Sequence, residues 1–229
     1  MSIKLYDLCG RDNKRFSPFG WRTRMALVHK GLETSAELVR FTEKEKLEFS
    51  GQKLVPVIVD GETVVNDSWA IAEYLEDTYP ELPSLFGSAA GRGMAKTITK
   101  FVDMTILPKL PNLIIADLVE NVDERCRPYF IESREKRFGK SLAEVQEGRD
   151  ERVGEFRKAM EPIRQVLATQ PYICGEAPAY GDIPLFSVLQ WSRVGSPYAV
   201  IEAGDPIHDW FERMLDQYNG EGRSEAAAS

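Results

Sequence analysis

Patterns typical of β-strands are confined to residues 1–86 of this 229-residue chain. The run Ile3–Leu8 predicts a first strand. A helical pattern over Pro18–Lys30 ends at Gly31, a residue type that commonly follows a helix. A second strand is expected over Ser35–Phe41. The chain therefore opens with the order strand, helix, strand.

A β-hairpin and a second helix complete this region. The β-branched run Leu54–Val59 and the returning strand Glu62–Val65 are joined by Asp60-Gly61, which is a strong hairpin signal. Asp67-Ser68 then forms a good cap for a helix over Trp69–Thr78. The order β-α-β followed by a hairpin and a helix requires a small mixed sheet with helices on its faces.

The remainder of the chain has helical periodicity and no strand alternation. The expected helical segments are 92–120, 125–138, 142–168, 180–194 and 205–218. The stretch 132–158 contains eight basic and seven acidic residues, which predicts a solvated helical face. The predicted fold class is α/β plus all-α. We expect an α/β domain at 1–86, a linker at 87–91 (GSAAG), a helical domain at 92–220 and a disordered tail at 221–229.

The composition narrows the function classes. Lys and Arg number 29 against 36 Asp and Glu, and the resulting net charge of −7 argues against a nucleic-acid partner. The apolar runs are too short to span a bilayer, and the N-terminus lacks the apolar core of a signal peptide. Three cysteines without short spacing predict no disulfide framework and a reducing, cytoplasmic location. With only two histidines, no metal site is predicted.

Ser17 stands where the first predicted helix begins. A serine followed by a proline is a good N-cap, so a purely structural role is one interpretation. The alternative is functional, because a hydroxyl at the positive end of a helix can stabilise a bound thiolate. Lowering a thiol pKa by about two units is worth about 2.7 kcal/mol. The residue by itself leaves both interpretations open.

Two other motifs have the same ambiguity. Pro56 is either a trans proline at a sheet edge or a cis proline that turns the backbone N–H and C=O of Val55 towards an extended peptide. One interpretation of Asp67 and Ser68 is that they only cap a helix. The other is that they bind a ligand: the Ser68 hydroxyl and the backbone amides would bind a carboxylate, and Asp67 would bind an ammonium group. A γ-glutamyl group carries both of these charges on one carbon.

The order and spacing of these motifs resemble those of cytosolic glutathione transferases over about residues 3–223. The motifs are SPFGW (17–21), LVPVIVDGE (54–62) and NDSWAIAEYLEDTYP (66–80). Segments 148–168 and 205–223 resemble the serine-type bacterial β-etherases of lignin breakdown and the fungal etherase-like class. The resemblance implies an N-terminal thioredoxin-like domain, a C-terminal helical bundle, glutathione as cosubstrate and a homodimer.

The resemblance also implies a role for each matching residue. Ser17 would stabilise the glutathione thiolate. Val55, before a cis Pro56, would pair with the cysteinyl backbone of glutathione. Lys53 or Gln52 would meet the glycyl carboxylate.

Two further matches concern the ends of helices. Asp67 and Ser68 would hold the γ-glutamyl end of glutathione. Asp182 matches the family's N-capping aspartate, although Ala179 stands where the family usually has Ser, Thr or Asn. The long polar loop 9–16 departs from the family, and it is a candidate for reshaping the entrance of the site.

Cys9 offers a rival interpretation as the nucleophile of a thiol transferase. It precedes the predicted helix by eight residues, and the chain has no CxxC motif. A reactive cysteine favours a helix N-terminus, which Ser17 occupies instead. We therefore expect Cys9 to be a buried thiol without a catalytic role.

The predicted activity is attack by the glutathione thiolate on a hydrophobic electrophile, such as a β-aryl ether or another aromatic compound. The alternatives are a ligandin that binds glutathione and aromatic compounds with little turnover, and an interaction protein that keeps only the fold. Trp191 and Trp210 are expected in the core. The candidates for lining the substrate side of the site are Phe19, Trp21, Met104 and Leu107. At least two of these four are expected to pack in the core instead.

Overall fold

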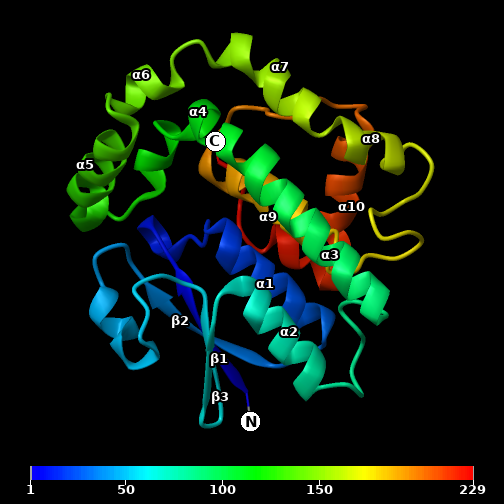
Figure 1. The fold of residues 1–229 in the computed structure, drawn as a ribbon. Coiled ribbons are helices and arrows are strands. Elements are labelled where there is room, and N and C mark those ends of the chain that lie inside the picture. The colour runs from blue at the N-terminus through cyan, green and yellow to red at the C-terminus, as the bar shows by residue number, and fades with distance from the viewer. Residues whose placement is uncertain (1, 229) are drawn as a thin grey trace.

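The computed structural model describes residues 2–228 and contains a sheet-bearing half and a helical half (Figure 1). Within those residues, one sheet of four strands has the order β2-β1-β3-β4. β1 is parallel to β2 and antiparallel to β3, and β3 is antiparallel to β4. The strands are β1 Ile3–Leu8, β2 Thr34–Val39, β3 Val57–Asp60 and β4 Thr63–Asn66. This is the small mixed sheet that the order of the motifs predicts.

Two helices, α1 (Pro18–His29) and α2 (Ser68–Thr78), lie between the sheet and the helical half (Figure 1). The buried ring of Trp21 on α1 meets Phe186 of α9 (Ile183–Gly195) edge-on, with the ring centroids 6.1 Å apart. At Gly20 a Cβ would lie only 1.8 Å from a carboxylate oxygen of Asp7 on β1. Glycine therefore lets the first turn of α1 approach the end of β1 closely.

The second half is entirely helical within the described residues. Its α-helices are α3 Ala89–Phe101, α4 Pro111–Ile114, α5 Arg127–Phe138, α6 Leu142–Gln146, α7 Arg149–Ala159, α8 Glu161–Leu167, α9 and α10 Pro206–Gly220. The two halves confirm the predicted fold class, α/β plus all-α. Between residues 2 and 228, no helix has the length and apolar character that crossing a bilayer requires.

Two long helices expected from the sequence are divided into shorter ones. The segment 92–120 contains α3, a π-helical turn at Val102–Ile106 and several short turns. Pro108 and Pro111 lack the N–H that a continuous helix needs there. The segment 142–168 is interrupted at Gly148, which has a positive φ of 68°, and again before Pro162.

The expected linker and tail differ from the structure. Of residues 87–91, the last three belong to α3, because the Ser88 hydroxyl caps this helix by accepting the Gly91 N–H at 3.0 Å. Residues 221–228 also have defined contacts. Glu221 pairs with the buried Arg24 at 2.5 Å, and the Ala228 N–H donates to the Arg193 carbonyl. A buried guanidinium requires a counter-charge, which this segment supplies. The boundary at residue 86 stays a prediction.

Asp182 occupies the start of α9 and is fully buried. Its carboxylate accepts the Ala179 N–H at 3.2 Å, which is the backbone half of a capping box. Because position 179 is alanine, the side-chain half is absent. The carboxylate also accepts from the Ile173 N–H at 2.7 Å and from the Trp210 indole at 2.9 Å. Asp182 therefore connects α9 to the preceding loop and to α10.

Candidate functional site

Ser17 lies directly before α1 and is 7% exposed. Its hydroxyl oxygen accepts the Gly20 N–H at 3.1 Å, and Pro18 occupies the first helical position. The structural interpretation of Ser17 as an N-cap is therefore confirmed. The same bond uses only an acceptor lone pair of the hydroxyl, so its proton remains free to donate to a ligand.

A cavity of about 630 Å³ opens beside Ser17, between the two halves of the chain. Of the residues predicted to form the site, Ser17, Lys53 and Val55 line it. On the helical side it is lined by Asp103, Leu107, Pro108, Pro111, Ile115, Leu118, Tyr129, Phe130, Arg134, Arg137, Phe138 and Trp191. A hydroxyl at a helix N-terminus thus faces a space large enough for a small peptide and a second molecule.

The Val55-Pro56 peptide bond is cis, as in the second of the two interpretations of this proline. Pro56 is buried and does not line the cavity, whereas Val55 does. Within residues 2–228, no hydrogen bond uses the backbone N–H or C=O of Val55. These two groups are therefore available to pair with an extended ligand.

Asp67 and Ser68 lie at the start of α2 and are not among the cavity-lining residues. The Asp67 carboxylate accepts the N–H groups of Trp69 and Ala70, both at 3.0 Å, and its backbone has a φ of 71°. Ser68 is buried, and its carbonyl accepts from the Tyr180 hydroxyl. The capping role is confirmed for Asp67, whereas Ser68 is the first residue of α2 and its side chain caps nothing. Gln52 is exposed and does not line the cavity either.

The loop 9–16 contributes little to the cavity, since Phe16 is its one lining residue. Arg15 pairs with Asp7 at 2.9 Å, and Lys14 donates to Asn121 at 3.1 Å. Cys9 is fully buried, and burial raises the pKa of its thiol to about 11. A thiol of that pKa is protonated near neutral pH, which agrees with the prediction that Cys9 is not a nucleophile.

Two of the aromatic and apolar candidates, Met104 and Trp191, differ in position from the expectation, and Trp21 alone of the four substrate-side candidates is a core residue, where at least two were expected. Phe19 and Leu107 line the cavity, and Trp21 is core. Met104 is 77% exposed and lies outside the lining. Trp191, expected in the core, lines the cavity, whereas Trp210 is fully buried as expected.

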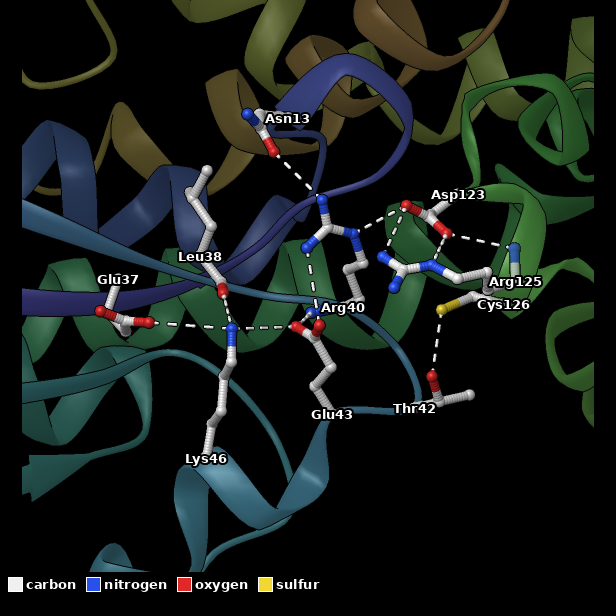
Figure 2. Close-up of polar contacts among 10 residues, drawn as sticks. All are labelled: Asn13, Glu37, Leu38, Arg40, Thr42, Glu43, Lys46, Asp123, Arg125 and Cys126. Atoms are coloured by element: carbon white, nitrogen blue, oxygen red, sulfur yellow. Dashed lines mark hydrogen bonds and ion pairs between the residues drawn. The ribbon is translucent and has the colours of Figure 1, made fainter.

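An ion network joins the two halves at the edge of the cavity (Figure 2). Arg40, directly after β2, donates to Asp123 at 2.7 Å and pairs with Glu43. Hydrogen bonds from Arg125 and Arg40 lower the pKa of Asp123 to about 2. Asp123 therefore stays ionised at any physiological pH. Arg40, which lines the cavity, has its charge neutralised within the protein.

Sequence reasoning missed the contribution of α5 to the cavity. Phe130, Arg134 and Phe138 are spaced four residues apart, so they share one face of this helix. Arg134 and Phe138 belong to the stretch 132–158, which is predicted to be solvated, and Phe130 lies just before it. The spacing of the two phenylalanines is the signal that distinguishes this face from a fully solvated one.

The site has no cluster that suits a metal. Among residues 2–228, no group of three or more His, Cys, Asp or Glu side chains is arranged to hold an ion.

Comparison with known proteins identifies both halves. Residues 16–78 match the family model "Glutathione S-transferase, N-terminal domain", and residues 93–217 match "Glutathione S-transferase, C-terminal domain". The glutathione S-transferase-like protein ustS of Aspergillus flavus is 30% identical over 138 residues, which are 56% of this chain and 50% of that protein. The chain spans about half the length of several curated relatives that it matches, this one included.

Solved structures resemble the chain over almost its whole length. Glutathione transferase GSTFuA2 of Phanerochaete chrysosporium is 27% identical, with a TM-score of 0.77 over 96% of this chain and 94% of that one. A glutathione S-transferase of Ceriporiopsis subvermispora, solved in complex with glutathione, has a TM-score of 0.84 at 21% identity, over 96% and 97% of the two chains. The second likeness supports the fold alone, and the first agrees with the resemblance to the fungal etherase-like class.

Proposed function

This chain belongs to the glutathione S-transferase family, and from that premise we propose that it binds glutathione beside Ser17 and joins the glutathione sulfur to a hydrophobic electrophile. The observation that carries the proposal is the position of the Ser17 hydroxyl, which caps α1 and lines the cavity between the two halves. Glutathione is the cosubstrate, and no metal has a part in the proposed reaction.

The proposed chemistry begins with ionisation of the glutathione thiol. The Ser17 hydroxyl donates to the sulfur while its oxygen accepts from Gly20, and the N-terminus of α1 adds a favourable dipole. The thiol proton leaves to water. The thiolate then forms a carbon–sulfur bond with the electrophile, and the leaving group departs with the electron pair of the broken bond.

Glutathione is proposed to lie along the sheet-bearing side of the cavity. Its cysteinyl backbone pairs with the free N–H and C=O of Val55, which the cis Pro56 follows. Lys53 lines the cavity and has no hydrogen bond within residues 2–228, so it is assigned to the glycyl carboxylate in preference to Gln52. The γ-glutamyl end would then extend beyond the cavity lining to Asp67 and Ser68 at the start of α2.

Asp67→Asn tests the γ-glutamyl assignment. Loss of the carboxylate charge is expected to raise the Kd of glutathione about fivefold, equivalent to about 1 kcal/mol, because the α-ammonium loses its ion pair. Asparagine also caps helices and tolerates a positive φ, so the thermal midpoint should stay unchanged. Calorimetric titration measures the effect. A glutaryl analogue that lacks the amine should bind both proteins equally, and an unchanged Kd for glutathione itself would remove Asp67 from the site.

The electrophile is proposed to be an aromatic compound, with β-aryl ethers as one candidate class in which a phenolate would leave. Support comes from the lining of the helical side, where Phe130, Phe138 and Trp191 offer aromatic surface. Turnover of aryl halides and a model β-aryl ether tests the proposal, beside calorimetry with the same compounds. Tight binding without turnover across that set would favour the ligandin alternative, and failure to bind glutathione would favour an interaction protein.

A homodimer and a cytoplasmic location are also proposed on family grounds. Sedimentation equilibrium would detect the dimer as twice the 25.9 kDa mass of one chain.

A further inference from the structure

The cavity wall is strongly basic in a chain that carries a net charge of −7. Five basic side chains line it, against the single carboxylate of Asp103. Asp103 is neutralised by Arg22 at 2.6 Å, and Arg40 by Asp123 and Glu43 (Figure 2). The remaining cations are Lys44, Lys53, Arg134 and Arg137. The cavity thus concentrates positive charge that its own acidic residues do not cancel.

None of these four side chains pairs with a carboxylate within residues 2–228, where the ion pairs involve other basic residues. Lys44 donates to the Tyr129 hydroxyl at 2.8 Å and lies 4.7 Å from the centre of that ring. Arg134 stacks on Phe130 and Phe41, at 4.4 and 4.8 Å from the ring centres. Lys44 and Arg134 therefore lie on aromatic faces, and no carboxylate of residues 2–228 pairs with either of them.

Arg134 is half-buried, whereas Lys53 and Arg137 are exposed. Burial lowers the pKa of Arg134, although an arginine remains protonated at neutral pH. Its one hydrogen bond within residues 2–228 goes to the neutral Ser133 hydroxyl at 2.8 Å. A partly desolvated cation gains more from a charged hydrogen-bond acceptor than a hydrated one does. Arg137 is one turn along the same face of α5, so two guanidinium groups are available to one ligand.

Glutathione does not account for this charge. Its glycyl carboxylate is assigned to Lys53, on the sheet-bearing side of the cavity, and its γ-glutamyl end to α2. Lys44, Arg134 and Arg137 remain, and they adjoin the aromatic side chains that would receive the second ligand.

We propose that the second ligand of this cavity is an aromatic carboxylate. Its ring lies among Phe41, Phe130 and Phe138, and its carboxylate accepts hydrogen bonds from Arg134 and Arg137. This inference rests on the proposed function for the reaction, but binding of the carboxylate itself does not require turnover. It makes the protein selective for anionic aromatic compounds, where the fold alone predicts only a hydrophobic electrophile.

Two matched pairs of compounds test the proposal. The reactive pair is para-chloro-meta-nitrobenzoate and the corresponding benzamide, and the unreactive pair is a naphthalene carboxylate and its carboxamide. The carboxylate is expected to exceed the amide at least tenfold, because a charged hydrogen bond is replaced by a neutral one. For the first pair the measure is kcat/KM divided by the uncatalysed rate constant with glutathione, which removes the greater intrinsic reactivity of the amide, and for the second pair it is the affinity. Both pairs are measured with the full chain at low salt.

The double variant Arg134→Gln, Arg137→Gln should lose this preference, leaving the carboxylate and the amide within about threefold of each other. Lys136→Gln is the control for the loss of positive charge from α5, because it removes one such charge from an exposed position that does not line the cavity. It should retain the preference. The thermal midpoints of both variants establish that α5 remains folded.

The outcomes separate the inference from the proposed function. Equal handling of carboxylate and amide by the unmodified protein, or a preference that survives the double variant, overturns the inference. A parallel loss of glutathione affinity in the double variant also overturns it, because the two arginines would then serve the glycyl carboxylate. Carboxylate-selective binding without any turnover supports the inference and contradicts the transferase function.

Discussion

Ser17→Ala is expected to raise the pH at which bound glutathione becomes a thiolate by about two units, and to lower turnover at neutral pH about 100-fold. The variant removes the hydroxyl proton that faces the cavity, while the dipole of α1 remains. Because the thiolate is the nucleophile, the loss should appear in kcat and shrink as the pH approaches the pKa of the unassisted thiol. Thiolate absorbance of the glutathione complex, followed against pH, measures the shift directly.

Two controls separate ionisation from folding in this experiment. Ser17→Ala also removes the hydrogen bond to Gly20, which should cost about 1 kcal/mol of stability as the loss of a helix cap. Ser88→Ala removes an equivalent cap, the bond to Gly91 at 3.0 Å, from a helix start that does not line the cavity. It should lower the stability similarly and leave the thiolate titration unchanged. Ser17→Thr retains a hydroxyl and should keep most of the activity.

An unchanged titration in Ser17→Ala would remove the catalytic role from this residue. The capping bond would then be its whole function, as the structural interpretation of the sequence holds. The nucleophile would have to be ionised by the helix dipole and the basic cavity wall alone.

Local sequence signals predicted the sheet-bearing half well. The strand at Ile3–Leu8 has the predicted bounds, and Ser17 caps the first helix. The hairpin turns at Gly61-Glu62, one residue later than the predicted Asp60-Gly61, because Asp60 still pairs with Thr63. Each of these features is set by residues within a few positions of one another, through alternation, turn propensity or capping. The sequence does not determine whether the Val55-Pro56 bond is cis or trans, because the residues around a proline permit both isomers.

The helical side of the cavity was not predictable in the same way. Lys44 and Tyr129 are 85 positions apart in the sequence, and their contact exists only once the two halves are packed. Arg134 belongs to a stretch of mixed charge whose ordinary interpretation is a solvated surface. The same long-range origin explains Trp191, which was expected in the core and which the packing of the two halves leaves on the cavity wall.

Asp182→Ala is expected to lower the free energy of unfolding by about 3–5 kcal/mol. The carboxylate is fully buried and accepts four hydrogen bonds, from the N–H groups of Ile173, Cys174 and Ala179 and from the Trp210 indole. Alanine would leave these donors without an acceptor in a dry interior. Burial raises the pKa of Asp182, and the donated hydrogen bonds oppose that shift.

Urea unfolding at one fixed protein concentration measures this loss, and Asp205→Ala provides the matched control. Asp205 caps α10, accepting the Ile207 N–H at 2.8 Å, and pairs with Arg164 at 3.0 Å, but it is partly exposed, so water can replace both contacts. Its removal should cost about 1–2 kcal/mol. The loss of stability in Asp182→Asn should fall between those of the two alanine variants, because its amide keeps one acceptor oxygen but turns N–H groups towards other donors.

Equal losses of stability in Asp182→Ala and Asp205→Ala would show that Asp182 acts as an ordinary cap. A much larger loss for Asp182→Ala would instead identify its carboxylate as the connection that holds α9, and with it the Trp191 side of the cavity, against α10.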